Sequence, residues 1–161
     1  MNTHEEYMEL ALEEAMKAEE IDEVPVGCII VCDGEIIARG HNLKEQLNQA
    51  YAHAEMMTIQ KAAEVKGNWC LNDCDLYVTL EPCMMCTGII NLSRIRTVYY
   101  GTTDPKGGCL ETVIDLKKIN RLNHYPNIVG NILQKECSEI LTNYFRKKRE
   151  TTKEKNKANI Q

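Results

Sequence analysis

The order of its predicted elements places this chain in the α/β class. We expect three α/β/α layers, with helices on both faces of a mixed five-stranded sheet. Two observations predict this class: helical segments alternate with short β-rich runs, and the length of 161 residues suits one domain without internal repeats. We expect that domain over residues 1–149 and a basic, frayed tail over residues 150–161.

Four helices and five strands follow from the local patterns. The first helix has apolar residues at helical spacing between acids, and Gly67 ends the second as a cap. The predicted helices are residues 4–20, 53–65, 84–92 and 133–149, and the predicted strands are residues 26–32, 35–39, 75–80, 97–100 and 127–132. Between the first two strands, Asp33-Gly34 is a strong hairpin signal. The polar stretches 40–51 and 102–112 are predicted loops.

Composition excludes several classes of protein. The chain is 43% hydrophobic and 27% charged, which is typical of globular proteins. It has no apolar run of the roughly 18 residues that span a bilayer, and its acidic start does not resemble a secretory signal. We therefore expect a cytoplasmic protein without membrane contact. In that setting, its eight cysteines favour reduced thiols and metal ligation over disulfides, with Cys28 and Cys32 as buried small hydrophobes.

Charge is distributed unevenly over the chain, although the net charge is only −5. Residues 1–23 carry nine acids and one lysine, whereas residues 146–161 carry seven basic residues and two acids. Such a basic end can bind a polyanion while the acidic body stays soluble. A solvated helix end is the alternative, and charge alone leaves both open.

Two short motifs indicate the chemistry. They are His53-Ala54-Glu55 and Pro82-Cys83-Met84-Met85-Cys86, each at a predicted helix start. One imidazole and two thiolates make three protein ligands for zinc, and the fourth tetrahedral position stays open for water, as in catalytic sites. Helix N-termini also favour thiolates. We therefore predict His53, Cys83 and Cys86 as the ligands of one zinc ion per chain.

Glu55 is the predicted proton-transfer residue. It lies two residues after the histidine, where a carboxylate can face the water at the metal. It can take a proton from water and deliver protons to a ring nitrogen and a departing amine. His-x-Glu followed by Pro-Cys-x-x-Cys is the signature of zinc deaminases. A four-cysteine zinc knuckle from Cys70, Cys74, Cys83 and Cys86 stays an alternative, although its spacings suit a zinc ribbon poorly.

Beyond these motifs, the chain resembles the bacterial tRNA-specific adenosine deaminases of the cytidine deaminase superfamily. The similarity runs from the first helix to Arg149. It includes Val24-Pro-Val-Gly27, Gly40-His-Asn42, Leu76-Tyr-Val-Thr-Leu-Glu-Pro-Cys83, Ser93-Arg94-Ile95, Asp104-Pro-Lys-Gly-Gly-Cys109, Leu122-Asn-His124 and Tyr144-Phe-Arg146. The resemblance implies a cytidine-deaminase-like fold and a homodimeric zinc hydrolase. It further implies that this enzyme converts adenosine to inosine at the wobble position of tRNA and that the partner subunit helps to form the RNA surface.

The resemblance also implies substrate-binding residues. Asn42 matches an asparagine that bonds to the flipped base and its sugar, Asp104 and Asn123 match loop positions that contact anticodon nucleotides, and the last helix borders the RNA. The implied set is Asn42, Ala54, Asp104, Asn123, Phe145, Arg146 and Lys148. Without the resemblance, Asn42, Asp104 and Asn123 are ordinary cap and turn residues.

The chain departs from the family pattern twice, with Gln49-Ala50-Tyr51 before the histidine motif and Leu110-Glu111 after the glycine-rich loop. Both flank the expected substrate entrance, so RNA affinity or context preference can differ. Two other functions stay open: a free-base or nucleoside deaminase, for guanine or cytosine, and a non-enzymatic zinc-binding RNA module. The module would use four protein ligands and would leave Glu55 without a role.

Overall fold

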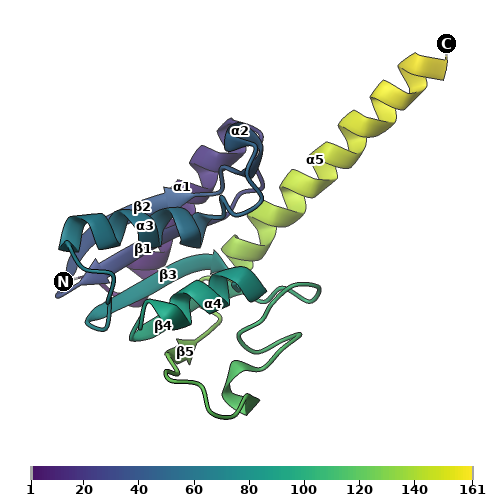
Figure 1. Cartoon of the computed structure of the whole chain (residues 1–161). Helices are drawn as coiled ribbons and strands as arrows, with labels where there is room; N and C mark the ends of the chain where they lie inside the picture. The colour runs from purple at the N-terminus through teal and green to yellow at the C-terminus, as the bar shows by residue number, and fades with distance from the viewer. Residues whose placement is uncertain (1, 161) are drawn as a thin grey trace.

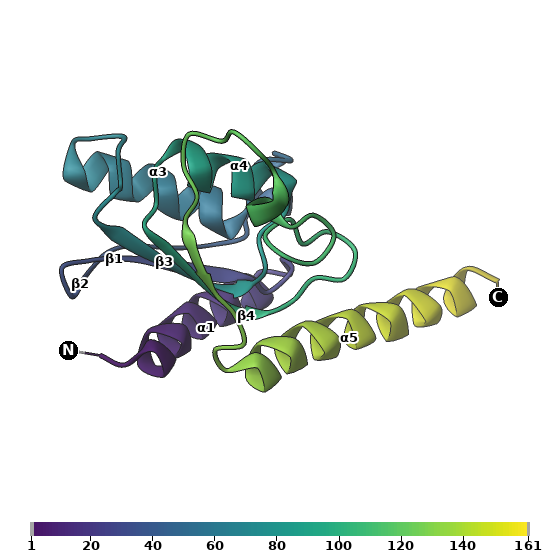
Figure 2. The same ribbon diagram turned by 90° about the horizontal axis from the view of Figure 1, so that it is seen from below.

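A five-stranded mixed sheet lies between two layers of helices in the computed structural model, which describes residues 2–160 (Figures 1 and 2). The strands are β1 (Gly27–Cys32), β2 (Glu35–His41), β3 (Cys74–Leu80), β4 (Thr97–Thr102) and β5 (Asn127–Val129). The helices are α1 (His4–Glu20), α2 (Lys44–Leu47), α3 (Ala54–Lys66), α4 (Met84–Leu92) and α5 (Gln134–Ile160), with a short 3₁₀ turn at Leu116–Lys118. The predicted α/β/α class is confirmed.

The strand order is β2-β1-β3-β4-β5. Strand β1 pairs antiparallel with both β2 and β3, whereas β3, β4 and β5 run parallel. Parallel neighbours need a crossover, and α4 provides it between β3 and β4. Because β3 is central, the loop after its carboxyl end lies in the middle of one edge of the sheet.

Helices cover the two faces of the sheet separately. Figure 2 shows α3 and α4 on one face and α1 and α5 on the other. Side chains alternate accordingly along β1: Cys28 and Ile30 pack under α3, whereas Ile29 and Val31 pack against α1. All four are buried, and the strand therefore reads as a continuous apolar run rather than an alternating one.

The predicted hairpin is confirmed at Asp33-Gly34. Both residues have positive φ, 50° and 78°, as a two-residue type I′ turn requires. This turn joins β1 to β2, and the register shifts once between Ile30 and Val31, which marks a bulge. Helix α3 also ends as predicted, at Gly67 in the left-handed region with φ of 64°.

Three predicted boundaries were wrong. The loop over residues 40–51 contains the short helix α2, and the last strand ends at Val129 instead of residue 132. The last helix does not end near Arg149 but continues through the expected tail to Ile160 (Figure 1). No proline or glycine interrupts residues 134–160, and residues 145–160 are all exposed. Local helix propensity, not packing, therefore maintains this projecting half of α5.

The length and polarity of the helices bear on whether they could cross a bilayer. Within residues 2–160, none of them combines the length and apolar character that crossing a membrane requires.

Candidate active site

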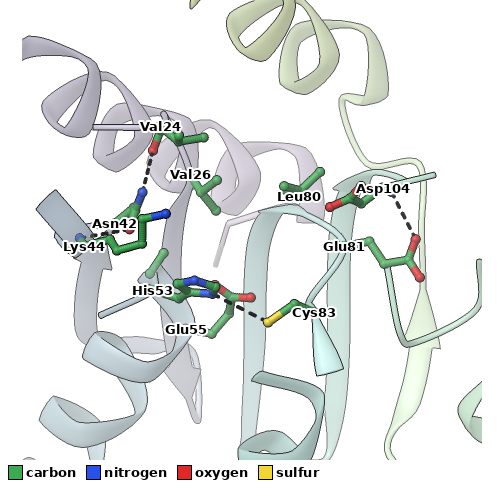
Figure 3. Close-up of a pocket in the computed structure, with 11 residues that line it drawn as sticks. Val24, Val26, Asn42, Lys44, His53, Glu55, Leu80, Glu81, Cys83 and Asp104 are labelled. Carbon is green, nitrogen blue, oxygen red and sulfur yellow. Dashed lines mark hydrogen bonds between the residues drawn. The ribbon is translucent and has the colours of Figure 1, made fainter. Parts of the chain in front are cut away.

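Two helix starts bring the predicted metal ligands together, and Figure 3 shows two of them, His53 and Cys83. His53 is the N-cap residue of α3, and Cys83 is the N-cap residue of α4. Cys86 lies in the first turn of α4 and is fully buried. Because α3 and α4 pack on the same face of the sheet, both N-termini point toward one place, where their partial positive charge favours thiolates.

The donor atoms of this triad fit a zinc ion. Nδ1 of His53 lies 3.5 Å from Sγ of Cys83 and 3.7 Å from Sγ of Cys86. Ligands of a tetrahedral zinc, with Zn–S of about 2.3 Å and Zn–N of about 2.0 Å, are about 3.5 Å apart. The three side chains are thus already placed at ligand separations, and one imidazole with two sulfurs is a donor set that zinc prefers.

The electrostatics of the triad favour a thiolate at Cys83. Hydrogen bonds from the Cys86 thiol and from His53 lower the pKa of Cys83 to about 4, against the opposing effect of burial. The same contact with Cys83, together with burial, raises the pKa of Cys86. A thiolate at Cys83 favours a cation at this position.

Glu55 lies in the first turn of α3 and is only 4% exposed. Burial raises the pKa of its carboxyl to about 7, because removal from water disfavours the charged form. A group with such a pKa can accept and donate a proton near neutral pH. Its place beside the triad is that of an acid–base residue.

A cavity of about 170 Å³ opens in front of the triad (Figure 3). Three of the predicted substrate-binding residues line it: Asn42, Ala54 and Asp104. The complete lining is Val24, Val26, Asn42, Lys44, His53, Ala54, Glu55, Leu80, Glu81, Cys83 and Asp104. A pocket with apolar walls and a few convergent polar groups is the usual form of a small-ligand site.

Asn42 and Asp104 also have the local roles expected of cap and turn residues. The side chain of Asn42 donates to the carbonyl of Val24 at 3.3 Å and accepts from the backbone of Lys44 at 3.2 Å. Oδ1 of Asp104 accepts from the backbone N–H groups of two residues of its own turn, Lys106 and Gly107, each at 3.1 Å. These bonds orient both side chains and leave each with further hydrogen-bonding capacity.

Glu81 orders the cavity entrance, a role that no sequence pattern indicated. Its carboxylate is 2% exposed and accepts five hydrogen bonds. The donors are the backbone N–H groups of Asp104, Leu110, Glu111 and Thr112 and the hydroxyl of Thr112. A Cβ atom at Gly108 would come within 2.4 Å of this carboxylate. The glycine and the glutamate thus fit together, and the 104–112 loop wraps around the acid.

The first departure from the family pattern, Gln49-Ala50-Tyr51, lies at an exposed turn, and the second, Leu110-Glu111, belongs to the loop around Glu81. Tyr51 is exposed, and Ala50 precedes it in the turn before α3. Leu110 is fully buried in the core under α4. Oε1 of Glu111 accepts a hydrogen bond from the hydroxyl of Tyr100 at 2.6 Å. Leu110 and Glu111 therefore stabilise the loop rather than face the cavity.

A larger groove, of about 880 Å³, continues from the cavity along α5. Phe145 lines it together with Arg149, and Asp104 borders both hollows. Two other predicted contacts on α5 do not line the groove: Arg146 is exposed elsewhere on the helix, and Lys148 forms an ion pair with Asp22 at 2.6 Å.

Asn123 does not line the cavity of its own chain. It is exposed on the segment between the 3₁₀ turn and β5. The neighbouring His124 fixes this segment to α4, because its carbonyl accepts from Asn91 at 2.6 Å and its ring donates to the carbonyl of Ile95 at 2.7 Å. The structure thus places Asn123 beside α4, and not with Asn42 and Asp104.

The four-cysteine alternative does not agree with the structure. Among the described residues, Cys83 and Cys86 group with His53, whereas Cys74 groups with Cys32 and an aspartate elsewhere. Cys70 belongs to neither group.

Comparisons with known proteins agree with this geometry. The family model for the cytidine and deoxycytidylate deaminase zinc-binding region matches residues 1–102 of this chain. The fold and the site therefore define a zinc-binding deaminase. A tRNA-specific adenosine deaminase from Bacillus subtilis is 47% identical to this chain over 153 residues, which are 95% of each chain. A tRNA-specific adenosine deaminase from Aquifex aeolicus is 43% identical over 145 residues, which are 90% of this chain and 95% of that one. The chain belongs to the family of tRNA-specific adenosine deaminases.

Solved structures show the same relationship. A structure from a study of A-to-I editing by tRNA:A34 deaminases at the wobble position of transfer RNA has a TM-score of 0.82 and 46% identity, and covers 84% of this chain and 99% of its own. A guanine deaminase from Bacillus subtilis has a TM-score of 0.61 and 40% identity over 64% of this chain and 66% of its own.

Proposed function

We propose that this protein converts adenosine to inosine at the wobble position of a tRNA anticodon. The observation that supports it most directly is the buried Glu55 beside a zinc-type triad, in a cavity that continues into a groove along a basic helix. In the reaction, water adds to the carbon that bears the adenine amino group, and ammonia leaves. We propose residues 1–149 as the deaminase domain, because they contain every residue of this site.

His53, Cys83 and Cys86 would hold the zinc. When bound, zinc lowers the pKa of a coordinated water to about 7 and so supplies a nucleophile at neutral pH. Glu55 would take a proton from water at this site and deliver protons first to the ring nitrogen and then to the leaving amine. Its raised pKa suits both directions of transfer, and the surrounding burial excludes competing water.

The cavity is built for one flat base. Val24, Val26 and Leu80 supply apolar walls, and Asn42 supplies an amide that is already oriented by its neighbours. Ala54 presents a small side chain next to Glu55, so the base can approach the acid closely. A base must leave the stack to enter such a pocket, and this costs least from an unstacked loop.

The groove along α5 would hold the nucleotides that flank this base. Phe145 is 43% exposed there and can stack on an unpaired base, and Arg149 can pair with a phosphate. Among residues 2–160, neither Arg146 nor Arg149 has an acidic partner, whereas Lys147 and Lys148 pair with acids at the end of α1. Arg149, which lines the groove, can thus pair with RNA there, as can Lys106 in the groove and Lys44 in the cavity, whereas Arg146 offers its charge on another part of the helix.

We further propose a homodimer in the cytoplasm. A hollow of about 320 Å³ on the α4 side has apolar residues in its lining, including the exposed Met84, Leu92 and Ile119. Asn123 lies on the same side of the molecule, away from its own cavity. A second copy that covers this hollow would bring Asn123 toward the partner's RNA surface, which agrees with its expected role.

Incubation with unmodified tRNA that carries adenosine at the wobble position tests the function. We expect inosine at that position alone, read by sequencing, and no product from free guanine, cytosine or their nucleosides. Deamination of a free base with untouched tRNA would instead establish the alternative substrate.

Glu55→Ala separates catalysis from binding in this assay. We expect full zinc content and unchanged tRNA affinity with deamination lower by at least about 10²-fold, the usual contribution of general acid–base catalysis. The matched control is Glu64→Ala, on the same helix but in its last turn and away from the cavity. Activity of the Glu55 variant within about tenfold of the parent would refute the proposed role.

A further inference from the structure

A second group of metal-type ligands lies outside the deaminase site. Cys32, Asp73 and Cys74 place one sulfur, one carboxylate oxygen and one sulfur within 4.8 Å of one another. The two cysteines come from different strands and are direct partners in the antiparallel β1–β3 ladder. Cys32 was expected to be a buried small hydrophobe, but it is partly exposed, and only Cys74 is fully buried.

Each sulfur contacts a different oxygen of the Asp73 carboxylate, and both separations are close to those of metal ligands. Sγ of Cys32 lies 3.4 Å from Oδ2 of Asp73, and Sγ of Cys74 lies 3.4 Å from Oδ1 of the same carboxylate. For a tetrahedral zinc with Zn–S of about 2.3 Å and Zn–O of about 2.0 Å, the expected S···O separation is about 3.5 Å. The deaminase triad shows separations of the same size.

The surroundings of the cluster complete its charge balance. Two thiolates, one carboxylate and a divalent cation sum to one negative charge. Lys66 neutralises that charge, because its ammonium forms an ion pair with Asp73 and lies 3.8 Å from Sγ of Cys32. The C-terminal turn of α3, in which Lys66 lies, also favours positive charge nearby.

We propose that Cys32, Asp73 and Cys74 form a second metal site, which binds a soft divalent cation such as zinc. Two sulfurs with one oxygen suit zinc rather than magnesium or calcium, which prefer oxygen ligands. Binding forms two metal–thiolate bonds and one metal–carboxylate bond, and releases the two thiol protons to solvent. Water takes the remaining position, which the partly exposed Asp73 leaves accessible.

The site has a structural role, because it lies far from the reacting base. Helix α3 begins beside His53 and ends at Lys66, so its 13 residues separate the two sites by about 20 Å. The second site lies at the sheet edge where β1 ends, α3 ends and β3 begins, on the left of Figure 1. A metal there would connect the β1–β2 hairpin to the segment that enters β3.

Zinc stoichiometry tests the proposal on the purified holoprotein. After dialysis against defined free zinc, we expect two zinc ions per chain in the parent and one in Cys32→Ser, with deamination of tRNA unchanged. Asp73→Asn should weaken the second site by more than about tenfold, the loss that removal of even an outer-shell partner produces. Cys70→Ser is the matched control and should keep both ions, because Cys70 lies outside the cluster.

A measurement on the parent protein avoids dependence on the fold of the variants. Excess zinc should slow alkylation of Cys32 by iodoacetamide, mapped by mass spectrometry, and leave Cys70 unaffected. One zinc per chain in the parent, or two in a folded Cys32→Ser, would overturn the second site. Neither result bears on the deaminase proposal, which depends on the zinc at His53, Cys83 and Cys86.

Discussion

Replacement of Glu81 by glutamine should destabilise the loop of residues 104–112 at the entrance of the active site, although it only replaces one oxygen by an NH₂ group. The buried carboxylate accepts five hydrogen bonds, from the backbone N–H groups of Asp104, Leu110, Glu111 and Thr112 and from the hydroxyl of Thr112. Glutamine presents an NH₂ group in place of one oxygen. With this group at the Oε1 position, the Thr112 hydroxyl can turn to accept, but the N–H of Asp104 faces another donor.

The magnitude follows from this bond pattern. A buried donor without an acceptor costs about 1–3 kcal/mol. The three bonds to the remaining oxygen lose their ionic character, and charge-assisted bonds are roughly twice as strong as neutral ones. We expect Glu81→Gln to lower the free energy of unfolding by about 2–4 kcal/mol. For a chain of 161 residues, this corresponds to a fall in Tm of about 4–16 °C.

Thermal melts followed by circular dichroism, with kcat/KM on tRNA, test this expectation. The matched control is Glu111→Gln, the same substitution in the same loop, where the side chain accepts, among residues 2–160, only a hydrogen bond from the hydroxyl of Tyr100. An amide oxygen can replace that acceptor, so the control should cost less than about 1 kcal/mol. Equal Tm values for the two variants would show that the Glu81 carboxylate does not order the loop. We also expect kcat/KM to fall for Glu81→Gln, because Asp104 borders the cavity.

Three further predictions concern α5. Neutralising Arg146 and Arg149 should reduce the salt slope of tRNA binding by up to about 1.4, at about 0.7 per phosphate of a single strand. Neutralising Lys147 and Lys148 should reduce the slope less, because those lysines are already paired with acids. Equal slopes for the two double variants would contradict this expectation. Phe145→Ala should weaken binding by about 1–3 kcal/mol at unchanged salt slope, with Phe145→Tyr near the parent, and a changed slope would exclude stacking. Asp22→Asn should lower Tm at neutral pH and match the parent at acid pH. The hydrogen bond from Lys148 lowers the pKa of Asp22 below 3.8. The stabilisation by the Asp22 carboxylate is therefore present above pH 3.8 and is lost as the pH falls through the lowered pKa. A Tm difference independent of pH would refute that link.

Local chemistry explains which elements could be predicted. The Asp33-Gly34 turn and the cap at Gly67 need residues that tolerate positive φ, and this need is visible in the sequence itself. The metal triad was accessible for a similar reason: Cys-x-x-Cys at a helix start already brings two sulfurs to the same end of one helix. The end of α5 was mispredicted, because a charged helix without packing partners looks the same in sequence as a frayed tail.

The sequence by itself determined the fold class, the hairpin and the class of chemistry, because each depends on residues close together along the chain. Only the tertiary structure decided how distant segments meet. Glu81 interacts with residues more than 20 positions away, and Cys32 meets Cys74 through strand register. Asn123 separates from Asn42 because α4 fixes its segment on another side. Such long-range pairings depend on the packing of whole helices and strands, and no local spacing encodes them.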